Sequence, residues 1–162
     1  MTTPGRDLPF ETRTQAHAAL AALMGDQGTC LSCFSADFRA WPLDQAAFIR
    51  QLEQWALRDT RRPDAMRFLA LDWRQMSERF PRFAAFRRDF AHQVSCRQIS
   101  DSGARGLVEM AWSPHVAVYA YTATWMSGEA VQTASRLHAL RMRFDEVWEQ
   151  AAPACPAVIL GL

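Results

Sequence analysis

A histidine at the head of a strand-like stretch is the first residue of this sequence whose type and position could do chemistry. Residues 115–122 (HVAVYAYT) are rich in β-branched and aromatic side chains and lack proline and glycine, so they predict a β-strand that begins with His115. Ser127 and Gly128 follow a few residues later. An imidazole can act as a nucleophile or as a general acid and base, provided that charged or hydrogen-bonding partners surround it.

A second reactive pattern is the C-x-x-C formed by Cys30 and Cys33, a spacing found in redox and zinc sites. Residues 29–34 are typical of a buried strand, however, and residues three apart on a strand point to opposite faces. The sequence offers no second C-x-x-C and no closely spaced histidine pair to complete a tetrahedral site. We therefore interpret these cysteines as structural thiols, and we expect no metal site and no cofactor.

Composition limits the classes of function. The chain has 162 residues and is 49% hydrophobic, enough for one domain with a sizeable core. It has no apolar run long enough to span a membrane, and residues 1–15 lack the pattern of a signal peptide, so a cytoplasmic location is expected. All 18 basic residues are arginine, which excludes a Schiff-base lysine and a phosphate-loop lysine.

The arginines are unevenly distributed along the chain. The net charge is only +1, yet residues 58–97 contain ten arginines against five acidic residues, a balance of +5. Within this segment Arg82, Arg87 and Arg88 are candidate phosphate-binding residues, because they lie opposite the phenylalanines of one predicted helix. Arginine rows on amphipathic helices are more often solvated, so nucleic-acid binding is the less favoured interpretation, although it is not excluded.

Helices and strands alternate along most of the chain. Helices are expected at residues 11–24, 41–59, 81–90 and 130–150, and strands at residues 29–34, 66–72, 93–99, 106–112, 115–122 and 123–127. This alternation predicts an α/β fold: a single domain with a mixed, mostly parallel sheet flanked by helices. Residues 1–10 and 151–162 are expected to be terminal extensions of that domain.

The order of these elements, together with residues 115–122, resembles one half-domain of the phospholipase D-like superfamily. That family carries the motif H-x-K-x4-D on a strand. His115 stands at the histidine position, whereas Ala117 replaces the lysine and Thr122 replaces the aspartate. The motif is therefore degenerate in this chain.

Two further segments carry the resemblance. In the family a Gly-Ser-x-Asn-like turn follows the motif strand; here Ser127 and Gly128 occupy it in inverted order, with Glu129 near the asparagine place. The closing helix of the family often contains Phe-x-x-x-Trp, which Phe144 and Trp148 match. The resemblance covers residues 12–150 by element order.

The resemblance implies a fold and a lost reaction. In the family the histidine attacks phosphorus, the lysine neutralises the developing charge, and two motifs, from two half-domains or a homodimer, form one site. This chain has no lysine, and Thr122 cannot orient an imidazole as a carboxylate does. We therefore expect no catalytic residues, with His115 a vestigial position.

Four residues are candidates for lining a pocket: His115, Ser127, Glu129 and Asp72. Asp72 ends the predicted strand 66–72, at what would be the carboxyl edge of a sheet. The favoured interpretation of Asp72 is nevertheless a cap of the helix that follows it. Glu109, within a predicted strand, is expected to face solvent by alternation.

The leading hypothesis is a catalytically inactive phospholipase D-like domain that acts as a binding or structural module. It is expected to form a homodimer through the edge that pairs the two half-sites in the family, and to take a phosphate-containing ligand. One alternative is a divergent phosphodiesterase or phosphoryl-transfer enzyme around His115 and Ser127. Another is a nucleic-acid-binding protein that uses the arginine-rich segment.

Overall fold

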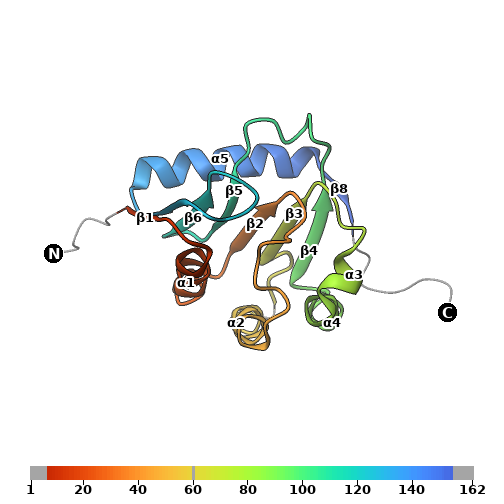
Figure 1. Cartoon of the computed structure of the whole chain (residues 1–162). Helices are drawn as coiled ribbons and strands as arrows, with labels where there is room; N and C mark the ends of the chain where they lie inside the picture. Colours follow the sequence, from red (N-terminus) through yellow and green to blue (C-terminus); the bar gives the residue numbers. More distant parts are fainter. Residues whose placement is uncertain (1–6, 60, 155–162) are drawn as a thin grey trace.

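In the part of the chain that the structure describes, eight strands form one mixed sheet with helices on both faces (Figure 1). The structure is a computed structural model that describes residues 7–59 and 61–154. The strands are β1 (Leu8–Phe10), β2 (Leu31–Ser35), β3 (Met66–Ala70), β4 (Val94–Gln98), β5 (Glu109–Trp112), β6 (Ala117–Ala120), β7 (Gly128–Val131) and β8 (Ala152–Pro153). They lie in the order β1-β7-β6-β5-β2-β3-β4-β8.

The sheet is mostly antiparallel, so the predicted mostly parallel sheet is wrong. Among the described strands only β2, β3 and β4 run parallel to one another, with Leu31 opposite Met66 and Met66 opposite Val94. The pairings β1–β7, β7–β6, β6–β5, β5–β2 and β4–β8 are all antiparallel. The physical reason is the short connections around β6, which can join only antiparallel neighbours, whereas a parallel pair needs a longer crossover.

Helices α1 (Arg13–Leu23), α2 (Ala46–Ala56), α3 (Met76–Arg79) and α4 (Pro81–Asp89) lie on one side of the sheet, and α5 (Ala134–Gln150) covers the other (Figure 1). Each side has its own cluster of buried apolar side chains. Pro81 occupies the first turn of α4, where its missing N–H costs nothing. The alternation of α and β in the sequence therefore predicted the β2–β4 half of the fold well.

Arg67 of β3 lies beneath α5 and joins that helix to the sheet. Its Nε donates to Ser32 Oγ on β2 at 3.0 Å, and its Nη2 is 2.8 Å from Asp145 Oδ1 on α5. The guanidinium also lies over the rings of Phe144 and Trp148, at 5.0 and 5.5 Å from their centroids. Asp145 thus pairs with the charge of Arg67, and aromatic rings of α5 cover the guanidinium, so the charge is not buried unpaired.

The region between β6 and β7 differs from the prediction. Residues 123–127, expected to be a strand, form a loop, and β7 (Gly128–Val131) includes the first two residues of the predicted last helix. Trp125 explains the difference: its φ is 57°, and its buried ring stacks with Phe10 and meets Trp41 edge-on. An extended strand cannot contain that left-handed backbone.

Parts of the predicted terminal extensions belong to the sheet. β1, within residues 1–10, pairs with β7, and β8, within residues 151–162, pairs with β4. These two short strands form the edges of the sheet, and each contains a proline, Pro9 and Pro153. Residues 1–6 and 155–162 of those predicted extensions lie outside the described residues.

We predict that Gly128→Ala destabilises the fold. A methyl group at this position would lie 2.0 Å from the Tyr119 carbonyl oxygen and 2.6 Å from the Phe10 ring, so β6 or β7 would have to shift. The free energy of unfolding, measured by urea denaturation, should fall by about 1–3 kcal/mol. The neighbouring change Ser127→Ala is the control and should stay within about 0.5 kcal/mol of the parent; equal effects of the two changes would contradict the prediction.

Candidate functional site

His115 lies in the turn between β5 and β6, before the strand that it was expected to begin. Its side chain is 65% exposed, and its Nδ1 is 3.0 Å from Asp26 Oδ1. Ser113 Oγ donates to Asp26 Oδ2 at 2.6 Å. Burial opposes ionisation of Asp26, but the hydrogen bonds from Ser113 and His115 outweigh it and lower the pKa of this carboxyl. The arrangement ties the end of α1 to the β5–β6 turn.

The three motif positions do not converge on one site. Ala117, at the lysine position, is fully buried within the sheet, opposite Trp112 and Val131. Thr122, at the aspartate position, is exposed beyond the far end of β6, where its hydroxyl is 2.7 Å from that of Thr124. Because β6 separates His115 from Thr122, the degenerate motif defines no common pocket.

Glu129 belongs to a separate cluster on the α5 side of the sheet. Its carboxylate accepts a hydrogen bond from the Tyr119 hydroxyl and one from Arg136 Nη2 at 2.6 Å. Arg136 also lies 2.6 Å from Asp7. The bond from Arg136, and then that from Tyr119, lower the pKa of Glu129. The negative charge of Glu129 is thereby compensated by Arg136. The contacts of Glu129 with Tyr119 and Arg136 join β7 to β6 and to α5.

Ser127 precedes β7 and acts through its backbone, since its carbonyl accepts the N–H of Tyr121 at 3.0 Å. Among the residues that the structure describes, no hydrogen bond or ion pair joins His115, Ser127 and Glu129 to one another. The pocket-lining expectation holds for His115, which lines a hollow of about 630 Å³ beside β1 and α1. Ser127 and Glu129 are not among the residues that line it.

Asp72 lies at the carboxyl end of β3, and it does not cap the following helix. The N-cap position of α3 is Gln75, and no side-chain hydrogen bond caps this helix. The Asp72 carboxylate instead accepts the backbone N–H of Arg74 at 2.9 Å and pairs with the Arg74 guanidinium at 2.9 Å. These bonds lower the pKa of Asp72 to about 2. The favoured cap interpretation was wrong, and Asp72 lines a pocket.

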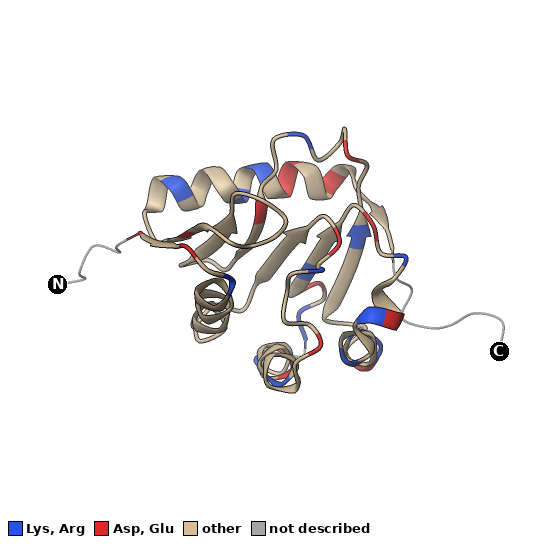
Figure 2. Ribbon diagram, viewed as in Figure 1, with Lys and Arg blue, Asp and Glu red and all other residues tan. Residues whose placement is uncertain are grey.

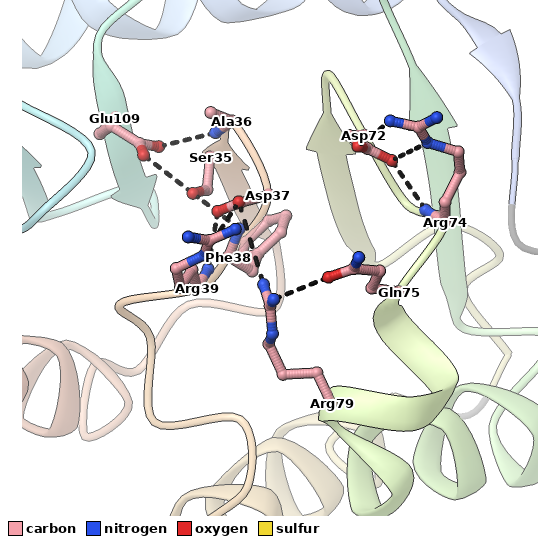
Figure 3. Close-up of polar contacts among 10 residues, drawn as sticks. All are labelled: Ser35, Ala36, Asp37, Phe38, Arg39, Asp72, Arg74, Gln75, Arg79 and Glu109. Atoms are coloured by element: carbon pink, nitrogen blue, oxygen red, sulfur yellow. Dashed lines mark hydrogen bonds and ion pairs between the residues drawn. The ribbon is translucent and has the colours of Figure 1, made fainter.

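That pocket, here the arginine pocket, has a volume of about 230 Å³ and opens beyond the carboxyl ends of β2 and β3 (Figure 3). It is lined by Asp37, Arg39, Asp72, Arg74, Gln75, Met76, Arg79 and Phe80. Arg39 and Arg79 contact Asp37 only loosely, at 3.4 and 4.0 Å, while Arg79 donates to Gln75 Oε1 at 2.7 Å. Guanidinium donors that are not fully engaged suit an oxyanion such as phosphate.

Glu109 is a buried carboxyl at the start of β5, next to the end of β2. Ser35 Oγ donates to its Oε1 at 2.9 Å, and the N–H of Ala36 donates to its Oε2 at 3.2 Å (Figure 3). Burial, assisted by the negative charge of Asp37, raises the pKa of Glu109 to about 8. The hydrogen bonds from Ser35 and Ala36 favour the ionised form but do not outweigh the burial. The predicted solvent-facing position is wrong, because helices cover both faces of the sheet and all of β5 is buried.

A second pocket, here the edge pocket, adjoins Glu109 and has a volume of about 470 Å³. It lies beneath the loop between β4 and β5 and is lined by Phe34, Ala36, Leu71, residues 101–102 and 104–109, and residues 121–123. Sequence reasoning missed this site. The available signal was an acidic residue, Glu109, inside an otherwise apolar strand (LVEMAW).

The predicted phosphate-binding arginines do not form one basic surface. Arg82 Nη1 donates to the carbonyl of Asp44 at 2.7 Å, and Arg88 lies 3.6 Å from Asp89. Arg87 is half-buried. Figure 2 shows the basic residues spread over both sides of the sheet and several loops. The +5 balance of residues 58–97 is therefore dispersed in space.

Residues 7–59 and 61–154 contain neither a cluster of metal-ligating side chains nor a helix that could span a membrane. No three His, Cys, Asp or Glu side chains of this part gather around a point where a metal ion could bind. Cys33 is fully buried, and burial raises the pKa of its thiol. None of the described helices combines the length and the apolar character of a membrane span.

Comparisons with known proteins identify a shared fold. No family model matches the chain, and no curated protein matches it. Among solved structures, the chain is similar to TrmBL2, described as an archaeal chromatin protein with a novel mode of DNA binding, at 10% sequence identity and a TM-score of 0.65. The match covers 95% of this chain and 56% of TrmBL2. At this identity the likeness concerns the arrangement of the helices and strands.

We predict that Glu109 makes the stability of the protein fall as the pH rises. The folded state holds a proton up to a pKa of about 8, whereas the unfolded chain releases it near the ordinary value of 4.5. The contribution is therefore complete below about pH 4.5 and is lost as the pH rises through about 8. Urea denaturation at several pH values between 5 and 8 should show this slope, and Glu109→Gln should remove it.

The control is Asp72→Asn. Because the pKa of Asp72 lies at about 2, its contribution changes only at lower pH, and this variant should keep the parental slope between pH 5 and 8. A slope that is the same in Glu109→Gln and in the parent would show that Glu109 is ionised throughout.

Proposed function

We propose that this protein is a non-catalytic, phospholipase D-like binding module that holds a phosphate-containing small molecule in the arginine pocket. The observation that carries the proposal is a hollow at the carboxyl ends of two parallel strands that is lined by three arginines, Arg39, Arg74 and Arg79, against two aspartates. Ligands of open α/β sheets bind outside such strand ends. Phosphate oxygens match the paired donors of a guanidinium.

The surroundings of His115 support the non-catalytic part of the proposal. Histidine attack on phosphorus needs a cation to neutralise the phosphate oxygens, and Ala117 at the lysine position is a buried methyl group inside the sheet. The imidazole of His115 is engaged with Asp26, whose carboxylate also accepts from Ser113. The contacts among Asp26, Ser113 and His115 join the loop after α1 to the turn between β5 and β6, and this structural role accounts for them.

Nucleic-acid binding is the second candidate function. It is favoured by the shared fold of TrmBL2, a protein described as binding DNA. Against it, several arginines are committed within the chain: Arg58 donates to the carbonyls of Met24 and Gly28, and Arg67 is enclosed by α5. A small phosphate-bearing ligand therefore fits this molecule better than a long polyanion. The homodimer that the resemblance implies stays a prediction.

We predict that the protein does not hydrolyse phosphodiesters. A generic substrate such as bis(p-nitrophenyl) phosphate should give the same background rate with the parent and with His115→Ala, because among the described residues no hydrogen bond or ion pair brings an arginine to His115. The measurement is release of nitrophenolate by absorbance. Turnover that His115→Ala abolishes would support the divergent phosphodiesterase instead.

We predict that inorganic phosphate and pyrophosphate perturb the backbone resonances of the arginine pocket in NMR titrations. Arg79→Gln should weaken this binding by about tenfold or more, because a charged donor is lost. Arg88→Gln removes the same charge from an exposed position on α4 and should leave the affinity unchanged.

Two results would contradict that prediction. The first is equal loss of phosphate affinity in both variants, which would indicate nonspecific attraction to the basic residues. The second is absence of phosphate binding together with salt-sensitive binding of duplex DNA that Arg87→Glu and Arg88→Glu abolish, which would favour the second candidate function.

A further inference from the structure

The edge pocket is chemically unlike the arginine pocket. Apolar groups make up much of its wall, among them Phe34, Leu71, Leu107 and Val108. Its volume of about 470 Å³ falls within the range of pockets that hold small organic molecules, roughly 300–1,000 Å³. A pocket of this size that combines apolar walls with several polar side chains is suited to a ligand with an apolar body and a polar head group.

Glu109 is the polar feature that this pocket offers in its buried part. The side chain is 7% exposed, and each carboxylate oxygen accepts one hydrogen bond, from Ser35 or from Ala36. A carboxylate has about four lone-pair positions, so two acceptor positions are left over. Among the described residues, no Arg or His nitrogen forms an ion pair with Glu109. A buried carboxyl without a cationic partner is costly to ionise unless a ligand supplies the cation.

We propose that the edge pocket binds a small organic cation, a primary amine with an apolar or aromatic body, whose ammonium group pairs with the Glu109 carboxylate. Tyr121 is 59% exposed and lies at the same pocket, where the face of its ring is a second partner for an ammonium group. The apolar body of the ligand would contact the walls formed by Phe34 and Leu107. This proposal concerns a site other than the arginine pocket and does not rest on the proposed function.

Binding of an amine to Glu109 is coupled to release of the proton that the Glu109 carboxyl holds. Asp37 lies near Glu109 on the β2 side, and Asp101 and Arg105 line the rim of the pocket with opposite charges. With a pKa of about 8, Glu109 is mostly protonated at pH 7, so pairing with an ammonium group requires the carboxyl to release its proton to the buffer. The amine keeps its own proton, and about one proton is released for each ligand bound.

The test uses phenethylamine and its neutral counterpart 2-phenylethanol as probes. Calorimetric titration at pH 7 in two buffers of different ionisation enthalpy measures both the affinity and the number of protons released. The amine should bind more tightly than the alcohol and release about one proton, and NMR should map it to residues 104–109 and 121–123. Equal affinity for the two probes, or amine binding without proton release, would overturn the proposal.

Two variants complete the test. Glu109→Gln should weaken amine binding by about 10- to 100-fold and abolish the proton release, since the charged acceptor is gone. Tyr121→Ala, at an exposed position that leaves the core intact, should weaken it by about two- to fivefold. Unchanged amine affinity in both variants would refute the assignment. Phosphate titrated into the same samples reports the arginine pocket separately, so either site can fail without the other.

Discussion

Arg67 places a positive charge beneath a helix, and the packing of α5 on the sheet depends on how that charge is compensated. The guanidinium is satisfied from both sides, by Ser32 on β2 and by Asp145 on α5, and Phe144 and Trp148 cover it. Removing one partner of a buried ion pair leaves a charge that the interior does not solvate. The helices thus cover both faces of the sheet. The arginine pocket and the edge pocket lie beyond the carboxyl ends of its parallel strands.

The peptide of Ala36 organises that edge. Its carbonyl accepts the N–H groups of Leu71 and Asp72, each at 3.0 Å, and its own N–H donates to Glu109. Ala36 and Leu71 line the edge pocket, whereas Asp37 and Asp72 line the arginine pocket. The two turns that follow β2 and β3 therefore contribute to both pockets, to the largely apolar edge pocket with Glu109 and to the arginine pocket.

The sequence predicted well those features that depend on local periodicity. The strands β2, β3 and β4 and the helices α1 and α4 were expected within a few residues, because apolar spacing and the position of Pro81 define them. Strand direction was predicted wrongly, since alternation of helix and strand holds only for the middle of the chain. Direction depends on the lengths of connections and on pairing partners far away in the sequence.

The candidate site was less accessible to sequence reasoning. The grouping of His115, Ser127 and Glu129 followed from spacing along the chain, but β6 and β7 carry these residues into different surroundings. Glu109 was expected to face solvent because strand alternation assumes that one face of the sheet is exposed, whereas the whole of β5 is buried. Asp72 lay at a predicted strand end, which is a reliable guide to the carboxyl edge of a sheet.

The short edge strands have a consequence for how copies of this protein meet. β1 and β8 span three and two residues, and each carries a proline, which cannot donate to a neighbouring strand. Sheets with such borders resist extension by further strands, the route by which many β-rich proteins aggregate. Any lasting association between copies would therefore use side-chain surfaces and not a sheet continued from one molecule into the next.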